Sequence, residues 1–465
     1  MICAESITLK AGEEYLLQNV SFRLNDREHL IITGSSGSGK TILAKVLAGK
    51  IFASGSLKLV FSGNKKKVFV EQRMTLKNKS NTTDGYYQQR YNSYDNEDSD
   101  TVSELLVKVK NDKPRINFLS DQYNVQYILD KPLLQLSSGE HKRFQLIKAL
   151  LEEAQLLIFD EPFTGLDAES RKNLGAILKQ IGKYAQLIII AGAHFEYLDV
   201  FTHVLELKGG KVNFFGRKED YTFKTHISEK SRFDLSELPL SKNSKEFAIA
   251  VQMTNVSVKY GEKQILDSIH WLVNKGERWL VSGRNGSGKS TLLSLINGDN
   301  PQAYANDIIL FDRKRGTGET IWDIKKNIGF MSSELYAYFD KSITCFEAVA
   351  SGFFDTIGLY KKLTEEQIGL VHKWLNILHM QHDALKTLSS VSQGKQRLLL
   401  LARALVKNPP LLILDEPCQG LDSQQTKDFV NLVDEIAGNT DKTIIYVSHY
   451  DEEIPDCIKY TLRLN

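Results

Sequence analysis

The chain of 465 residues is too long for one ordinary hydrophobic core and predicts two to four domains. It contains 42% hydrophobic and 25% charged residues, a composition that excludes a disordered or fibrous protein. The formal net charge of +2 provides no global field that would attract nucleic acid or anionic lipid, so composition gives no strong nucleic-acid signal.

The four cysteines are scattered without paired or CxxC spacing, which argues against a disulfide framework, a zinc site or an iron–sulfur cluster. They favour a reducing compartment. The N-terminus has no basic start followed by an apolar run, and the most apolar stretches are of strand length. We therefore expect a cytoplasmic chain that does not cross a membrane by itself, with peripheral attachment at the inner face of the plasma membrane as the alternative.

The first chemical signal along the chain is HLIITGSSGSGKTILAKVLAGK at residues 29–50, which predicts an apolar strand, a glycine loop and a helix in succession. This is the context that a GxxxxGK(S/T) phosphate loop requires. Backbone N–H groups would surround the phosphates, Lys40 would reach the β and γ oxygens, and Thr41 would bind Mg²⁺. The predicted nucleotide-binding residues of this loop are Gly34, Ser35, Ser36, Gly37, Ser38, Gly39, Lys40 and Thr41.

A serine motif, LSSGE at residues 136–140, precedes the apolar run 156–159, which is typical of a buried parallel strand. The run delivers Asp160 and then Glu161 at its C-terminal end, where α/β folds place ligand chemistry. Asp160 is predicted to hold Mg²⁺ directly or through water, and Glu161 to polarise the attacking water. A carboxylate pair after a strand is by itself a modest signal, because such residues also cap helices.

The same ordered signals occur a second time, which indicates a duplicated domain. The second set comprises GRNGSGKS at residues 283–290, VSQGK at 391–395 and LLILDEP ending at Pro417. The serine, aspartate and histidine pairs differ by 255 positions, whereas the glycine loops differ by 249 (283 − 34), so the second copy has six extra residues in between. The second loop comprises Gly283, Arg284, Asn285, Gly286, Ser287, Gly288, Lys289 and Ser290, and the matching carboxylates are Asp415 and Glu416.

Between the copies, residues 217–246 are rich in Lys, Glu, Ser and Asp, and a fresh alternating strand pattern follows. We predict a first domain at residues 1–216, a linker at 217–246 and a second domain at 247–465.

In these motifs the chain resembles the ATP-binding cassette superfamily, whose signature serine and glycine bind the γ-phosphate of ATP held by the opposite cassette. The resemblance implies an α/β fold of two tandem P-loop NTPase cassettes, each with a RecA-like core and a helical signature subdomain. It also implies Mg²⁺-dependent ATP hydrolysis and intramolecular pairing of the two cassettes. The signature positions are matched by Ser137, Gly139, Ser392 and Gly394.

Other family elements follow by resemblance. Asp167 and Asp422 match the D-loop, and His449 in YVSHYDEE matches the switch histidine that contacts the γ-phosphate. His194 falls at the same offset of 255, but its surroundings, AGAHFEY, match less well. A one-residue shift would place Ala193 there instead, and a surface histidine is the alternative interpretation of His194.

The two copies depart from the family pattern in different places. Tyr260 lies 23 residues before Gly283 and matches the aromatic that stacks on adenine, whereas the same offset in the first copy gives Ala11. Tyr15 is the nearest alternative aromatic there. Gln72 matches the Q-loop glutamine, a ligand of Mg²⁺, whereas Ser333 stands at that place in the second copy.

A linker of about thirty residues without helical periodicity disfavours the ABC-F translation ATPases, and the lack of zinc cysteines disfavours the UvrA type. Residues 298–330 and 351–360 resemble the ModF (PhrA) type of bacterial tandem cassette, which is grouped with molybdate-transport ATPases. That resemblance implies the ATP-binding component of a transporter with a separate membrane permease. The alternative is a soluble ATPase that remodels a protein or nucleic-acid partner.

Overall fold

The structure, a computed structural model, describes residues 1–12, 14–60, 66–72, 100–133, 136, 138–166, 168–192, 198–222, 233–236, 238, 247–261, 263–284, 286–332, 335, 339 and 342–464. The chain divides into two compact units, Met1–His226 and Ile227–Asn465.

The first unit contains a mostly parallel sheet with the strand order β5-β6-β7-β3-β8-β9, in which only β9 runs antiparallel to its neighbour among the described pairs. Its strands are β3 (Leu30–Thr33), β5 (Lys67–Val70), β6 (Leu156–Asp160), β7 (Gln186–Ile190), β8 (His203–Lys208) and β9 (Lys211–Arg217). A second, antiparallel sheet has the order β2-β1-β4 and comprises β1 (Ile2–Ala11), β2 (Glu14–Leu24) and β4 (Ser54–Leu59).

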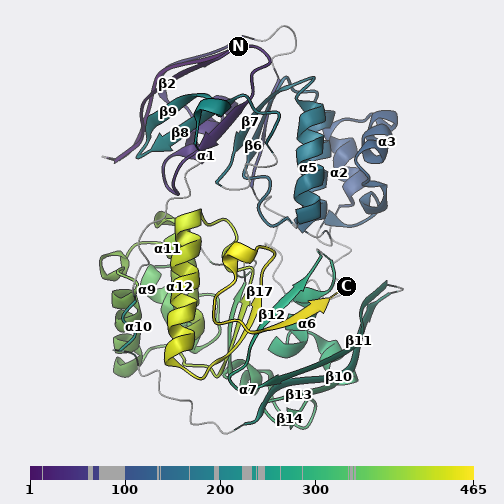
Figure 1. Ribbon diagram of the computed structural model, residues 1–465, viewed down its shortest axis with the longest axis vertical. Helices are drawn as coiled ribbons and strands as arrows, with labels where there is room; N and C mark the ends of the chain where they lie inside the picture. Colours follow the sequence, from purple (N-terminus) through teal and green to yellow (C-terminus); the bar gives the residue numbers. More distant parts are fainter. Residues whose placement is uncertain are drawn as a thin grey trace. The chain divides into compact units, whose positions relative to one another are not determined.

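Helices cover the sheets of the first unit. They are α1 (Lys40–Ala48), α2 (Val102–Val109), α3 (Lys113–Gln122), α4 (Ser138–Leu151) and α5 (Ala168–Ile181), with the short helices η3 (Gln126–Ile128) and η6 (Lys218–Asp220). Figure 1 shows α2 and α3 beside α5, on the other side of the parallel strands from β2. The helices α2, α3 and α4 share a separate apolar cluster that includes Leu106, Ile116 and Phe144, so they form a small helical layer with its own core.

The second unit repeats this plan with a parallel sheet of order β15-β16-β17-β12-β18 and an antiparallel sheet of order β11-β10-β13-β14. Its strands are β10 (Ile249–Tyr260), β11 (Lys263–Asn274), β12 (Arg278–Gly283), β13 (Asp307–Leu310), β14 (Arg313–Lys314), β15 (Ile328–Ser332), β16 (Leu411–Asp415), β17 (Thr443–Val447) and β18 (Tyr460–Leu464).

The α-helices of the second unit are α6 (Lys289–Asn297), α7 (Ile321–Lys325), α9 (Cys345–Ala350), α10 (Glu365–Ile377), α11 (Gln393–Leu405) and α12 (Ser423–Asn439). Its 3-10 helices are η7 (Pro301–Ala305), η8 (Ser351–Phe353), η9 (Gln381–Asp383), η10 (Leu388–Ser390) and η11 (Asp451–Glu453). The helices α9 and α10 lie beside α11, away from the antiparallel strands β10 and β11 (Figure 1). Two units with parallel sheets and helical layers confirm the predicted fold class.

The central strands form because their sequences are apolar on both faces. The β6 run LLIFD is buried at every position, and the β16 run LLILD is buried at all but its last. A strand without polar alternation is stable only with cover on both faces, which parallel sheets with helical layers provide.

The strand register brings the polar loops of each unit to one edge of its sheet. In the first unit, Ile32 of β3 and Asp160 of β6 both pair with Ile190 of β7, which lies between them. In the second unit, Val281 and Asp415 both pair with Val447. The segments that follow these strands therefore begin at the same edge, although more than 100 residues separate them in the sequence.

The segment predicted as a linker contributes to the second unit. Phe233, Leu235 and Leu238 are buried in the same apolar cluster as Trp374 of α10 and Phe429 of α12. The intervening Asp234 and Ser236 are exposed. At its other end, the predicted linker begins at Arg217, the last residue of β9.

This packing predicts that Leu235→Ala destabilises the second unit, by about 2–3 kcal/mol, because burying a leucine and avoiding a cavity are each worth that order. All four tryptophans, at positions 271, 279, 322 and 374, lie in the second unit, so their fluorescence during urea unfolding reports on it alone. The matched control is Ser236→Ala, at an exposed neighbouring position. Equal urea midpoints for the two variants would contradict the packing.

Candidate functional site

Both glycine loops require glycine at their first position. The backbone of Gly34 has φ 134°, and a Cβ there would meet the carbonyl oxygen of Leu207 at 2.1 Å. Gly283 has φ 155°, and its Cβ would meet the oxygen of Leu464 at 2.6 Å. The glycines at the fourth and sixth positions of the loops, Gly37, Gly39, Gly286 and Gly288, also have positive φ. The loops therefore keep an open backbone that no residue with a Cβ would adopt without strain.

Each loop holds its own lysine in the same way. The Nζ of Lys40, in the first turn of α1, donates to the backbone oxygens of Gly34 at 2.8 Å and Ser35 at 2.9 Å. The Nζ of Lys289, in the first turn of α6, donates to Gly283 at 2.8 Å and Arg284 at 2.9 Å. The two ammonium groups are thus fixed inside their loops at the N-terminus of a helix, which favours an anion.

Two buried hydroxyls in these loops are without a hydrogen-bond partner among the described residues. They are Ser38 Oγ in the first loop and Ser287 Oγ in the second. A buried polar atom without a partner is costly, so such an atom at a functional loop calls for an explanation. Their identical positions in the two copies fit a loop built to receive oxygen atoms of a ligand.

The remaining predicted loop residues lie between the strand and the helix of each unit or in the first turn of that helix. Ser35 and Ser36 precede α1, Thr41 and Ser290 occupy the second positions of α1 and α6, and Arg284 follows β12. Asn285 lies outside the described residues.

The carboxylate of Asp160 faces the first loop from the end of β6. Its Oδ1 accepts a hydrogen bond from the Thr41 hydroxyl at 3.3 Å. Burial raises the pKa of Asp160 above its usual value, while the Thr41 hydrogen bond lowers it. Asp415 ends β16 at the matching place in the second unit. Two side-chain oxygens from different elements therefore meet beside the first glycine loop, and oxygen is the atom type that hard divalent cations prefer.

The two glutamates that follow have an unusual backbone. Glu161 has φ 44° and Glu416 has φ 46°, in the left-handed region that non-glycine residues rarely adopt. Each is held there by a backbone N–H bond to the neighbouring strand, from Glu161 to Ile190 at 3.1 Å and from Glu416 to Val447 at 3.0 Å. Strain of this kind clusters at functional sites. The sequence alone gave no sign of it.

Glu161 lies in a partly buried polar cluster. Its Oε2 accepts a hydrogen bond from Gln72 Nε2 at 3.0 Å and a longer one from Thr164 at 3.4 Å. Burial raises the pKa of Glu161 to about 7, and the nearby Lys40 ammonium opposes that rise. Lys142 of α4 fixes the Gln72 backbone through a bond from Nζ to the Gln72 oxygen at 2.5 Å. The structure thus brings the predicted Gln72 and Glu161 together.

In the second unit a histidine approaches the matching glutamate, Glu416. His449 Nε2 lies 3.2 Å from Glu416 Oε1, within ion-pair distance but without hydrogen-bond alignment. The Ser448 hydroxyl before it donates to Glu453 at 2.6 Å and shapes the loop. Ser333, at the Q-loop position of this copy, lies outside the described residues.

The strand register changes which residue of the first copy is equivalent to His449. Asp160 pairs with Ile190 and Asp415 with Val447, so the offset between the copies is 257 here (447 − 190) rather than 255. By that offset Gly192 stands where His449 does. A Cβ on Gly192 would lie 3.8 Å from Glu161 Oε1, so this glycine lies beside the glutamate. His194 and Ala193 lie outside the described residues.

The signature residues are described mainly in the second unit. Ser392 caps α11, and its side chain accepts from the Lys395 N–H at 3.5 Å. A Cβ on Gly394 would meet the Gln425 side chain at 2.7 Å, so packing against α12 alone favours glycine there. Gly139 in α4 has room, with Leu166 at 3.9 Å. Ser137 and Asp167 lie outside the described residues, whereas Asp422 caps α12.

The predicted aromatic platform differs between the copies. Tyr260 ends β10 and is 36% exposed, so part of its ring is accessible. Ala11 ends β1 at the equivalent place. Tyr15 is 43% exposed, and Lys10 Nζ lies over its ring, 4.2 Å from the centroid.

Comparison with known proteins accounts for this duplicated arrangement. The family described as ABC transporter matches the chain twice, at residues 17–164 and 266–419. The chain is 35% identical to the ABC transporter ATP-binding protein ModF of Escherichia coli, over 98% of this chain and 95% of the relative. An uncharacterized ABC transporter ATP-binding protein of Schizosaccharomyces pombe is 33% identical, over 95% of this chain and 93% of the relative.

Among solved structures, the chain resembles an archaeal ribosome recycling factor crystallised with a ribosomal stalk protein, with TM-score 0.54 and 17% identity. That match covers 97% of this chain and 86% of the other. A structure titled RNase-L Inhibitor has TM-score 0.54 and 18% identity, covering 96% and 85%. At such identities the likeness shows the fold alone.

None of the helices in the described ranges combines the length and apolar character needed to cross a bilayer. The matches cover both halves, and each half carries a glycine loop with its lysine and a strand that ends in aspartate and glutamate. The chain therefore belongs to the ABC transporter family, as a protein with two tandem ATP-binding cassettes that binds ATP and acts as an ATPase.

Proposed function

We propose that each cassette hydrolyses ATP with the residues of its own glycine loop and strand ends. The observation that carries this proposal is the duplicated placement of a loop-bound lysine and a strained glutamate. Phosphate oxygens would replace the loop carbonyls as partners of Lys40 and Lys289, and would satisfy the buried hydroxyls of Ser38 and Ser287.

The oxygen ligands present fit Mg²⁺. Thr41, Asp160 and Gln72 would hold it in the first cassette, and Ser290 and Asp415 in the second. When bound, Mg²⁺ would neutralise charge that develops on the phosphates during transfer. The Thr41–Asp160 contact at 3.3 Å supports the first of these sets.

Glu161 and Glu416 would polarise the attacking water in the two cassettes. A carboxylate whose pKa lies near the working pH is well suited to accept a proton, and the pKa of about 7 for Glu161 supports this role. Gln72 orients Glu161 directly. His449 is the corresponding neighbour of Glu416, whereas a role for His194 stays a prediction.

For the physiological role, we propose the ATP-hydrolysing component of a transport system whose membrane subunits are separate chains. The extent of similarity to the ModF protein, 98% of this chain, supports the transport assignment. The pairing of the two cassettes, in which Ser137 and Gly139 would serve the second loop and Ser392 and Gly394 the first, rests on the family resemblance and stays a prediction.

A soluble ATPase that remodels a partner is the second candidate. Ser333 replaces the glutamine that family members use in the Q-loop, which counts against standard coupling to a permease in one half. The fold is also shared by a ribosome recycling factor.

Fractionation of cell extracts distinguishes the two roles. A chain carrying Glu161→Gln and Glu416→Gln should retain ATP, and under the transport proposal it should sediment with membranes and co-purify with a polytopic protein. The matched control carries Lys40→Ala and Lys289→Ala, which should weaken ATP binding and release the chain. Recovery of the ATP-retaining chain with ribosomes or DNA, and not with membranes, would favour the remodelling role.

The assignment of Glu416 predicts a separation of binding from chemistry. In a chain whose first site carries Glu161→Gln, the further change Glu416→Gln should lower the remaining hydrolysis by about 100- to 1000-fold, because the water loses its polarising group. ATP binding should persist, since Lys289 carries the phosphate charge. The control Glu452→Gln removes an exposed carboxylate and should leave the rate unchanged. A parental rate in the Glu416 variant would show the assignment to be wrong.

The aromatic difference predicts unequal sites. Stacking of a base on an aromatic ring is worth roughly 1–3 kcal/mol, so the Lys289 site should bind ATP about five- to 150-fold more tightly than the Lys40 site. Titration of Lys289→Ala should show only the weaker site, and titration of Lys40→Ala only the tighter one. If Tyr15 stacks on the first base, both lysine variants will show the same affinity.

A further inference from the structure

Tyr260, the proposed base platform of the second cassette, is held by a buried asparagine. Its hydroxyl accepts a hydrogen bond from Asn300 Nδ2 at 2.8 Å. Asn300 is 1% exposed, whereas the tyrosine is 36% exposed. The bond therefore fixes the inner, polar end of a ring that remains partly accessible. Because the hydroxyl is the terminal atom of the side chain, fixing it restricts the whole ring.

The same asparagine is tied to the helix of the phosphate loop. Its Nδ2 also lies 3.2 Å from Ser294 Oγ, and its backbone N–H donates to the Ser294 oxygen at 3.2 Å. Ser294 is buried in α6, the helix that begins with Lys289. Asn300 thus connects the element that carries the phosphate-binding lysine to the ring 40 residues earlier in the sequence.

Further side-chain amides bind the strand that leads to Tyr260. Gln302 Nε2 donates to the Lys259 oxygen at 3.0 Å, and its Oε1 accepts from the Lys259 N–H at 3.3 Å. Asn306 makes the same pair of bonds to Ser257, with Oδ1 accepting from the N–H at 2.8 Å and Nδ2 donating to the oxygen at 3.0 Å. These amides replace the bonds of a neighbouring strand and fix the end of β10.

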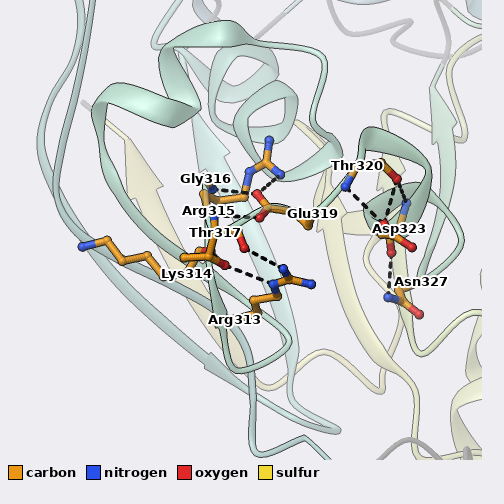
Figure 2. A network of polar contacts seen from close by, with 9 residues as sticks. All are labelled: Arg313, Lys314, Arg315, Gly316, Thr317, Glu319, Thr320, Asp323 and Asn327. Carbon is orange, nitrogen blue, oxygen red and sulfur yellow. Dashed lines mark hydrogen bonds and ion pairs between the residues drawn. The ribbon is translucent and has the colours of Figure 1, made fainter.

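A buried ion pair contacts the short helix η7, which lies between Asn300 and Asn306. Arg315 Nη1 donates to Glu319 at 2.8 Å, with side-chain exposures of 1% and 6%, and the guanidinium lies over the ring of Tyr304 in η7, 4.8 Å from the centroid. Figure 2 shows Glu319 also accepting from the backbone N–H groups of Gly316 and Thr317, at 2.7 and 3.0 Å. The short helix η7, between Asn300 and Asn306, therefore contacts a loop whose own hydrogen bonds and ion pair stabilise it.

Three of these groups are absent from the first cassette. The bond that Asn306 donates to the Ser257 oxygen does have a counterpart there, since the Ser54 hydroxyl donates to the oxygen of Thr8, the residue equivalent to Ser257 (257 − 249), at 2.9 Å. With the glycine-loop offset of 249, Tyr260 corresponds to Ala11, Asn300 to Ile51 and Gln302 to Ala53. The ring and the amides that hold it differ together between the copies. The asparagine thus occurs in the copy that has the ring and is absent from the copy that lacks it.

We propose that Asn300 is a positioning residue that fixes the Tyr260 ring for stacking on the nucleotide base at the Lys289 site. The inference rests on the proposed function, in which Tyr260 contacts the base. Orienting the ring before binding removes the entropy cost of ordering it in the complex. Loss of the hydroxyl bond should therefore weaken ATP binding by about two- to tenfold, a smaller effect than loss of the ring.

The test uses the full chain with Lys40→Ala, so that the second site dominates, and calorimetric titration with Mg·ATP and with inorganic tripolyphosphate, which has no base. Tyr260→Phe keeps the ring and removes the hydroxyl, and Asn300→Ala removes its partner. Each should weaken ATP binding about two- to tenfold, and the double variant no more than either single one, because both remove the same interaction. Tripolyphosphate affinity should not change. Ile51→Ala, at the matching position of the first cassette, is the control.

The outcomes distinguish the proposed role of Asn300 from the base stacking on Tyr260, on which that role depends. Parental ATP affinity in Tyr260→Phe, together with weaker binding in Tyr260→Ala, would overturn the role of Asn300 and leave base stacking intact. Equal losses of ATP and tripolyphosphate affinity in Asn300→Ala would also overturn it, because Asn300 would then act on the phosphate loop through Ser294. Parental affinity in Tyr260→Ala would reject the stacking itself.

Discussion

The parallel pairing of the central strands is the constraint on which each cassette depends. Because β7 pairs with both β3 and β6, the glycine loop and the Asp160–Glu161 pair begin at one edge of one sheet. The second unit has the same arrangement around β17. A one-residue slip of β6 or β16 would reverse the face toward which each side chain points and would move Asp160 or Asp415 away from its place at the polar edge. The core therefore fixes the register, and the register fixes the distance between lysine and carboxylate.

This edge also stores strain. Glu161 and Glu416 adopt left-handed backbone angles that cost about 1–3 kcal/mol each. The bonds of their N–H groups to β7 and β17 hold them there. The same strain recurs in both copies, within an Asp-Glu-Pro sequence that the copies share. It turns the carboxylates toward the polar loops, where Gln72 contacts one and His449 approaches the other.

The two copies have the same central strands but differ in the loop side chains that lie near the ends of those strands. In the first, an amide from the end of β5 contacts the glutamate, and Gly192 occupies the register position of the histidine. In the second, His449 is present, and a segment rich in amides fixes Tyr260. Loops tolerate such divergence because few core contacts depend on them. The two nucleotide sites are thus built on one scaffold but are chemically unequal.

The sequence by itself determined the family, the duplicated fold, the two glycine loops and the carboxylates after the strands, because each is a local strand–loop–helix signal with a fixed spacing. Only the tertiary structure decided three other features. Gly192 stands at the strand-register position of His449 because the segment between β16 and β17 is longer than that between β6 and β7, with 17 residues in α12 against 14 in α5. Phe233 and Leu235 belong to a core although their segment has a polar composition. The Asn300–Tyr260 bond joins residues 40 positions apart. The spacing of residues along the chain cannot reveal such contacts, because the distance between two residues in space is set by the fold and not by their separation in the sequence.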